Sequence, residues 1–379
     1  MRHSFIVSGM DLNDPNRGTA ALGYGALSFL KEKNYIDEKD SLLFIRPSVK
    51  FWKYKDYIEN SVIQGNRLDV KTVFIWKPIL DLYLATGIRL PFTKLTRILK
   101  EIKLVAAING GDGFSDIYNT KTFINRLSET ILAIKAKIPY VILPQTLGPF
   151  KSDKNFNLAR KILKGARYVY VRDDKFVSEL KEMGVQYEIT KDLSFYMKPE
   201  PWDIDIIPNS IGLNISGLCY SNSFRDLSGQ FDAYPSLIDS IIKMFQDRGK
   251  TIYLIPHSYC YEKFDENNDD IEACRLVYKK LSNKENIILI DKDMISPRIK
   301  YVISQMSFFI GTRMHANFAA IYTGVPLFGL AYSYKFAGAF DANGLSGAKQ
   351  TSMINNITTS EIPQILQKID ATYHKFVKE

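Results

Sequence analysis

Short runs of β-branched and aromatic residues alternate along the chain with segments of helical periodicity. Amphipathic stretches such as 119–137 and 174–182 separate these runs. Strands that alternate with helices in this way predict a parallel sheet with helices packed on its faces. In the first half the runs are SFIVS from residue 4, SLLFI from 41, TVFIW from 72, LVAAI from 104, PYVIL from 139 and YVYV from 168.

The pattern stops near residue 197 and then starts again. The stretch MKPEPWDIDIIPNS (197–210) has three prolines and no clear periodicity, so we interpret it as a linker. We therefore predict two Rossmann-like α/β domains facing a cleft, residues 1–198 and 199–379, with the last helix a candidate to pack back on the first domain. The second series has strands at IGLNI (211), TIYLI (251), NIILI (286), SFFI (307) and PLFGL (326), and helical patterns near 234–248, 268–282, 313–323 and 360–377.

The composition agrees with two folded domains and limits the classes of ligand that the protein is expected to bind. A chain of 379 residues is long for one core, and 46% hydrophobic with 24% charged residues is ordinary for a folded protein. The net charge of +9 favours a phosphate-bearing substrate, an anionic membrane surface or nucleic acid. Three widely spaced cysteines indicate neither a disulfide framework nor a zinc site. With no signal-peptide pattern and no long apolar window, we expect a cytoplasmic protein.

Residues that directly follow the predicted strands are the first candidates for a site, because ligands of open parallel sheets bind at the carboxyl ends of the strands. Glycine turns and helix caps explain some of these residues equally well. NGGDG lacks the Lys-Ser/Thr of a phosphate loop, SGMDLNDPNRG is not a dinucleotide fingerprint, and no motif requires a metal. The candidates are Asn16, Arg17, Gly18, Asn109, Gly110, Gly111, Asp112, Gln145, Arg172, Asp173 and His257.

The stretch FIGTRMHANFAAIYTGVP (309–326) predicts a strand end, a turn and a helix. Gly311 ends the strand, Thr312 is the expected N-cap, and Arg313 and His315 fall in the first turn. A helix N-terminus carries partial positive charge and unpaired N–H groups, so two potential cations there are unfavourable unless an anion lies nearby. We infer an anion-binding site.

The order of these motifs resembles the polysaccharide pyruvyl transferase family. The resemblance spans nearly the whole chain, and the last block is its most specific part. Met314 stands where leucine is usual, and Asn109 precedes the glycine-rich turn. The matching motifs are NRG (16–18), NGGDG (109–113), QTLGPF (145–150), VRDD (171–174), IPH (255–257) and GTRMHANFAAIYTGVPLFGLAYSYKFAG (311–338).

The resemblance implies a two-domain fold of the glycosyltransferase B type, with the acceptor on the N-terminal side and the donor bound by the C-terminal half. The implied donor is phosphoenolpyruvate, with no cofactor or metal required. Members of the family move pyruvate onto two hydroxyls of one sugar and form a cyclic ketal in a bacterial exopolysaccharide or capsule of the cell envelope. The resemblance does not indicate which sugar is the acceptor.

The resemblance also assigns roles to residues. A donor with a carboxylate and a phosphate suits several cations, because arginine binds both groups in a bidentate manner. His315, with Arg313, is the catalytic candidate, either as general acid or as stabiliser of the leaving phosphate. Asp112 or Asp173 would accept the hydroxyl proton. The expected donor-binding residues are Arg172, Arg313, His315, Lys335 and His257, and the expected acceptor-binding residues are Asn16, Arg17, Gly18, Asp112 and Gln145.

Two other functions share these features. One is a nucleotide-sugar-dependent glycosyltransferase of the same architecture, and the other is a non-catalytic relative that binds a glycan or a lipid phosphate. The acceptor could be a lipid-diphosphate-linked saccharide at the inner face of the membrane, which the positive charge and Phe51, Trp52, Tyr54 and Tyr57 would suit. An ordinary amphipathic element explains the same aromatics. Nucleic acid is not an expected partner.

Overall fold

The computed structural model describes residues 3–377 except 51, 118 and 334, without the side chains of 263–265 and 335. Its contacts divide the chain into two units. Unit 1 comprises Met1–Asp11 and Leu22–Met197, and unit 2 comprises Leu12–Ala21 and Lys198–Glu379. This division differs from a single boundary after residue 198, because residues 12–21 group with the second half. Helix α1 (Arg17–Glu32) therefore begins in unit 2 and ends in unit 1.

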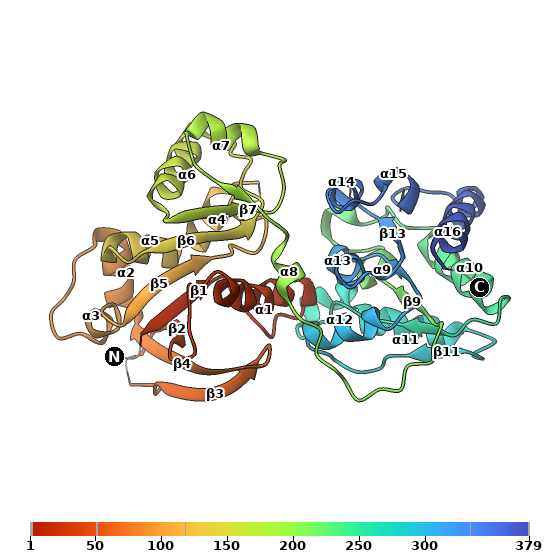
Figure 1. Cartoon of the computed structure of the whole chain (residues 1–379), viewed down its shortest axis with the longest axis horizontal. Coiled ribbons are helices and arrows are strands. Elements are labelled where there is room, and N and C mark those ends of the chain that lie inside the picture. Colours follow the sequence, from red (N-terminus) through yellow and green to blue (C-terminus); the bar gives the residue numbers. More distant parts are fainter. Residues whose placement is uncertain (1–2, 51, 118, 334, 378–379) are drawn as a thin grey trace. The chain divides into compact units, whose positions relative to one another are not determined.

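Unit 1 contains an eight-stranded sheet in the order β3-β4-β2-β1-β5-β6-β7-β8 (Figure 1). All neighbouring strands are parallel except β3, which forms a hairpin with β4 through a turn at Gln64 and Gly65, both with positive φ. The predicted parallel sheet thus has one antiparallel edge strand, which the sequence pattern did not indicate because β3 is mostly exposed and has no continuous apolar run. The strands are β1 (Ser4–Ser8), β2 (Ser41–Ser48), β3 (Tyr57–Ile63), β4 (Asn66–Trp76), β5 (Ile102–Ala107), β6 (Tyr140–Gln145), β7 (Tyr168–Val171) and β8 (Glu188–Ile189).

The helices of unit 1 pack their apolar faces on this sheet. The expected helix over 119–137 is broken at Leu127 into α4 and α5. Phe123 and Leu132 from these two helices are buried in one core with Val105 and Ile142 of the central strands. Besides α1, the helices are α2 (Lys77–Thr86), α3 (Lys94–Ile98), α4 (Thr120–Arg126), α5 (Ser128–Ala136), α6 (Asp153–Gly165), α7 (Val177–Met183) and α8 (Leu193–Tyr196).

Unit 2 contains a six-stranded, wholly parallel sheet in the order β11-β10-β9-β12-β13-β14 (Figure 1). The first strand lies in the middle, and the winding reverses between β9 and β12, as in a doubly wound Rossmann-like sheet. In unit 1 the same reversal occurs between β1 and β5, which confirms the predicted pair of Rossmann-like α/β units. The strands are β9 (Ile211–Asn214), β10 (Ile252–Leu254), β11 (Ile287–Leu289), β12 (Phe308–Gly311), β13 (Leu327–Ala331) and β14 (Thr351–Met353).

The last helix, α16 (Ile362–Phe376), buries its apolar face in the core of unit 2, where the ring of Tyr373 contacts Phe245 and Phe308 edge-on. Among the described residues, no helix combines the length and apolar character needed to cross a bilayer. The other helices of unit 2 are α9 (Gly217–Ser221), α10 (Tyr234–Gln246), α11 (Asp270–Lys280), α12 (Ser296–Ser304), α13 (Met314–Thr323), α14 (Lys335–Asp341) and α15 (Gly347–Gln350).

Candidate functional site

The candidate site of unit 2 lies where its sheet reverses winding, at the carboxyl ends of β10, β9 and β12. Asn214, the last residue of β9, links the three ends. Its side-chain oxygen accepts from the backbone N–H of Arg313 at 2.9 Å, and its side-chain nitrogen donates to the carbonyl of Ile255 at 2.9 Å. Sequence reasoning did not include Asn214, although it stands at a strand end like the residues that were included.

Asp270, at the start of α11, is a fully buried carboxylate that joins the loops around this site. Nη2 of Arg313 donates to Oδ1 at 2.6 Å, and Nε donates at 3.1 Å. The backbone N–H of Gly217 donates to the same oxygen at 2.8 Å. Oδ2 accepts from the N–H groups of His257 and Ser258 at 3.1 and 3.0 Å. Asp270 therefore holds the guanidinium and the loop after β10 in one arrangement.

Arg313 is the N-cap residue of α13 and has an extended backbone, so the helix begins at Met314. The expected N-cap, Thr312, was wrong: its hydroxyl lies 2.8 Å from the hydroxyl of Tyr234. A buried threonine hydroxyl needs a partner, and the tyrosine satisfies it away from the helix end.

The guanidinium of Arg313 is 11% exposed and also donates to the side chain of Asn268 at 2.8 Å. Burial alone would lower its pKa, but the Asp270 carboxylate more than offsets this, and the pKa is raised. The cation at the helix start thus has an internal counter-ion. The helix-dipole argument called for an anion beside Arg313, and the carboxylate of Asp270 is such an anion. An external anion would therefore bind in addition to this internal ion pair.

His315 lies in the first turn of α13, and its imidazole packs directly against Gly18 at the start of α1. A Cβ atom at Gly18 would lie 2.5 Å from Nδ1 and 2.7 Å from Cγ of His315. Asn16 caps α1, since its side-chain oxygen accepts from the N–H of Gly18 at 3.0 Å, and its backbone pairs with Ser258. The predicted NRG motif therefore lies in unit 2 next to the predicted histidine.

Arg17, the middle residue of this motif, is buried in unit 2. Its Nη1 donates to the carbonyl of Asp14 at 2.7 Å, and its Nη2 donates to the hydroxyl of Tyr261 at 2.6 Å and to the carboxylate of Asp293. Burial would lower its pKa, but the bond to Asp293 leads the opposing effects, and the pKa is raised. Arg17 thus stays charged and ties the segment before α1 to the loop after β10.

His257 is the neutral member of this group. It is buried, and its backbone carbonyl accepts from the N–H of Arg17 at 3.2 Å. Burial, followed by the charges of His315, Arg313 and Arg17, lowers the pKa of His257 well below its ordinary value. The imidazole is therefore uncharged at neutral pH and can hydrogen bond to a ligand without adding positive charge.

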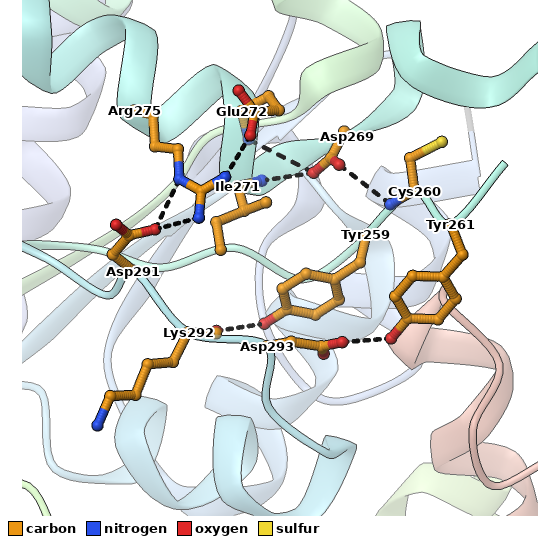
Figure 2. A pocket seen from close by; sticks show the side chains of 10 residues that line it. All are labelled: Tyr259, Cys260, Tyr261, Asp269, Ile271, Glu272, Arg275, Asp291, Lys292 and Asp293. Carbon is orange, nitrogen blue, oxygen red and sulfur yellow. Dashed lines mark hydrogen bonds and ion pairs between the residues drawn. The ribbon is translucent and has the colours of Figure 1, made fainter. Parts of the chain in front are cut away.

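A pocket of about 270 Å³ opens beside this group, between the loop after β10 and the segment after β11. Figure 2 shows the rings of Tyr259 and Tyr261 together on one side, with Asp293 bonded to the hydroxyl of Tyr261, and the ion pair of Arg275 and Asp291 on the other side. The lining has four carboxylates but only two cations, so it does not suit a highly charged anion that carries both a phosphate and a carboxylate. The residues that line it are Tyr259, Cys260, Tyr261, Asp269, Ile271, Glu272, Arg275, Asp291, Lys292 and Asp293.

The candidate residues of unit 1 gather around Arg172, directly after β7. Its Nη1 donates to Asp192 at 2.8 Å, its Nε donates to Thr146 at 3.0 Å, and Asp173 lies 3.6 Å from Nε. Burial would lower the pKa of Arg172, but Asp192, Asp173 and Asp112 together raise it. Three carboxylates thus surround one cation, and sequence reasoning missed Asp192.

Gln145 and Asn109 hold the strand ends of unit 1. Gln145 is fully buried, and its side-chain nitrogen donates to the carbonyls of Ala107 and Leu143 at 2.8 and 3.2 Å. Asn109 has a left-handed backbone and donates to the carbonyl of Arg126 at 2.6 Å. These bonds fix the edge of the sheet and leave the amide of Gln145 turned toward the interior.

Two other expectations concern Lys335 and a metal. Lys335 is the first residue of α14, and its side chain lies outside the described residues. Within the described part of the chain, no three histidine, cysteine, aspartate or glutamate side chains gather in a way that could hold a metal ion.

Two Rossmann-like units, each with candidate residues at the carboxyl ends of its strands, define a glycosyltransferase B type fold, and solved structures share it. The UDP-GlcNAc 2-epimerase from Neisseria meningitidis bound to UDP-GlcNAc matches with a TM-score of 0.55 and 13% identity over 100% of this chain and 94% of that chain. The enzyme of the same name from Methanocaldococcus jannaschii matches with a TM-score of 0.53 and 11% identity over 97% and 92% of the respective chains. At such identities the likeness concerns the fold alone.

The family model for polysaccharide pyruvyl transferase matches residues 16–334, so the chain belongs to this family. No curated protein sequence matches it significantly. The matched range begins at Asn16 and ends just before Lys335, and therefore includes both the segment that packs on His315 and the start of α13.

Proposed function

We propose that the protein transfers a pyruvyl group from phosphoenolpyruvate to two hydroxyls of a saccharide and forms a cyclic ketal in a cell-surface polysaccharide. Membership of the family supports the reaction class. The observation that carries the proposal is the geometry at the start of α13, where Arg313 is fixed by Asp270 and His315 is fixed by contact with Gly18.

The donor would bind at the N-terminus of α13. This helix of ten residues has no side-chain cap hydrogen bond at its N-terminus, which is the positive end of the helix dipole. Phosphate and carboxylate groups favour such a terminus. Because Asp270 already orients the guanidinium of Arg313, little side-chain entropy would be lost when a ligand binds. The neutral imidazole of His257 suits a hydrogen bond to an oxygen of the donor.

The reaction requires two proton movements on the donor side. A proton adds to the methylene carbon of phosphoenolpyruvate, and the central carbon gains oxocarbenium character. A sugar hydroxyl attacks that carbon and loses its proton, and a second hydroxyl then displaces phosphate. One hydroxyl proton replaces the proton given to the methylene carbon, and the other leaves with phosphate. We propose His315 for the first proton or for stabilising the leaving phosphate. Asp112 and Asp173 remain the predicted bases.

The test is mass spectrometry of the products from phosphoenolpyruvate and a small saccharide library that includes lipid-diphosphate-linked acceptors, with phosphate release measured in parallel. We expect phosphate release that depends on the acceptor and a product heavier by one pyruvyl ketal. A panel of nucleotide sugars is run alongside. Transfer from a nucleotide sugar, with no response to phosphoenolpyruvate, would overturn the proposal and favour a glycosyltransferase.

A further inference from the structure

Two neighbouring loops of unit 1 expose apolar side chains that the proposed reaction does not use. Residues 52–58 lead into β3, and residues 88–94 connect α2 to α3, in orange in Figure 1. Lys94 joins the two loops, because its ammonium group lies 2.9 Å from the carboxylate of Asp56 and 3.2 Å from the carbonyl of Phe74. We call the two loops together the apolar patch.

The side chains of the apolar patch are large and strongly exposed. Trp52 is 69% exposed, Ile58 is 61% exposed and Phe92 is 96% exposed. Phe92 also has a left-handed backbone, with φ of 60°, which is uncommon for a residue with a side chain. Residues 52–56 form a turn and extended chain in which the ring of Tyr54 stacks on Phe74, whereas the ring of Trp52 stays largely exposed. Contiguous apolar side chains at a surface indicate an interaction site.

The charge of the surrounding sequence indicates the kind of partner. Residues 46–103 contain twelve lysines and arginines but only five aspartates and glutamates, and so carry +7 of the chain's net charge of +9. Lys53 and Lys55 flank Tyr54 in the first loop, and Arg97 and Lys100 follow the second loop; all four are exposed. Exposed cations therefore lie within the first loop and shortly after the second loop of the apolar patch.

We propose that the apolar patch docks the protein on the surface of an anionic lipid bilayer. Tryptophan, tyrosine and lysine place an apolar body in the bilayer interface and a polar end in water. Each lysine or arginine near an anionic membrane contributes about 1 kcal/mol of attraction. A nucleic acid would use the cations and stack bases on the aromatic rings but would leave Ile58 unused, whereas a bilayer uses all of these side chains. This docking is independent of the reaction proposed above.

Cosedimentation of the full-length protein with vesicles tests the proposal. Vesicles of phosphatidylcholine mixed with phosphatidylglycerol are compared with pure phosphatidylcholine, each at low and high salt. We expect binding to the anionic vesicles that weakens with salt. The double variant Lys53→Gln/Lys55→Gln should bind about 25-fold more weakly, since each lost cation costs about fivefold. Phe92→Ser should cost at least about tenfold, because it removes a ring that would be buried.

Matched controls come from unit 2, where Lys243 and Leu276 are exposed. Lys243→Gln and Leu276→Ser should leave vesicle binding unchanged. All substitutions are at exposed positions, so unchanged urea midpoints confirm that folding is intact. Three results would overturn the proposal: no preference for anionic vesicles, equal losses in the controls, or loss with the lysine variants but not with Phe92→Ser. Self-association that Phe92→Ser abolishes would instead make the apolar patch an interface between copies.

Discussion

The Cα atom of Gly18 lies against the imidazole ring of His315, and no heavier residue fits between them. The ring atoms Nδ1 and Cγ of His315, and its Cβ atom, would all lie 2.5–3.0 Å from a Cβ atom at position 18. The glycine at the start of α1 therefore sets the position of the histidine at the start of α13, although the two are far apart in sequence. The contact lies within unit 2, to which both residues belong.

Gly18→Ala should displace the imidazole of His315 and lower turnover by about 100-fold, because a shift of about 1 Å in a catalytic group costs about that much. Kinetics with phosphoenolpyruvate and an active acceptor measure the effect, and a crystal structure of the variant measures the shift. Gly338→Ala is the matched control, since Gly338 lies in α14 and a Cβ atom there would meet nothing within 4 Å. Equal activity of the two variants would contradict the positioning role of Gly18.

Asp270→Asn should lower the free energy of unfolding of unit 2 by about 3–5 kcal/mol, because it leaves the guanidinium of Arg313 without its buried counter-ion. The measurement is urea unfolding. Asp291→Asn is the control: Asp291 and its partner Arg275 are both about half exposed, and a surface pair of this kind contributes about 0–1 kcal/mol. Similar losses for the two variants would show that Asp270 is no more important than a surface residue.

His315→Gln should reduce turnover by at least about 100-fold if the imidazole transfers a proton, because glutamine donates a hydrogen bond but does not titrate. In that case the donor KM changes little and the pH dependence of kcat loses the limb that belongs to the histidine. Partial activity with an unchanged pH profile would indicate the phosphate-stabilising role. His374→Gln, on the exposed side of α16, is the control. Turnover like that of the unsubstituted protein would refute the site assignment.

His257→Gln should flatten the dependence of stability on pH. Burial, aided by His315, Arg313 and Arg17, lowers the pKa of His257, so the unfolded chain binds a proton below about pH 6.5 that the folded chain does not. Stability from this group is therefore present above the unfolded pKa and is lost as the pH falls, by about 1.4 kcal/mol per pH unit. Urea unfolding between pH 7.5 and 5.5 measures the slope, and an unchanged slope in the variant would contradict a neutral buried imidazole.

The sequence predicted the strands that are buried on both faces, and it missed the one that is not. Runs such as LVAAI and YVIL coincide with β5 and β6, because a central parallel strand needs apolar residues on both faces. β3 reads YIENSVI, with three consecutive polar residues between two apolar pairs, and lies at the sheet edge, so its signal was too weak to find. The turn at Gln64 and Gly65, which joins β3 to β4, was the feature of the sequence that could have indicated a hairpin.

The strand-end rule predicted where several candidate residues lie in the fold but not the residues that bond to them. Arg313, His257 and Arg172 all lie after strands as expected, and Asn214 would have followed from the same rule. Asp270 and Asp192 could not be found in this way, because their roles depend on arginines that are distant along the chain. In the sequence NNDDI both aspartates resemble helix caps, and only the fold shows that Asp269 caps α11 while Asp270 bonds to Arg313.

The grouping of residues 12–21 with unit 2 has a consequence for exchanging parts between members of the family. A chimera joined at residue 198 would combine the His315 of one protein with the Gly18 and Arg17 of another. The glycine and the histidine of that contact would then come from different parent proteins, and their shapes would no longer be matched. A functional exchange of unit 2 must therefore carry residues 12–21 with it, as a second short transplant near the beginning of the chain.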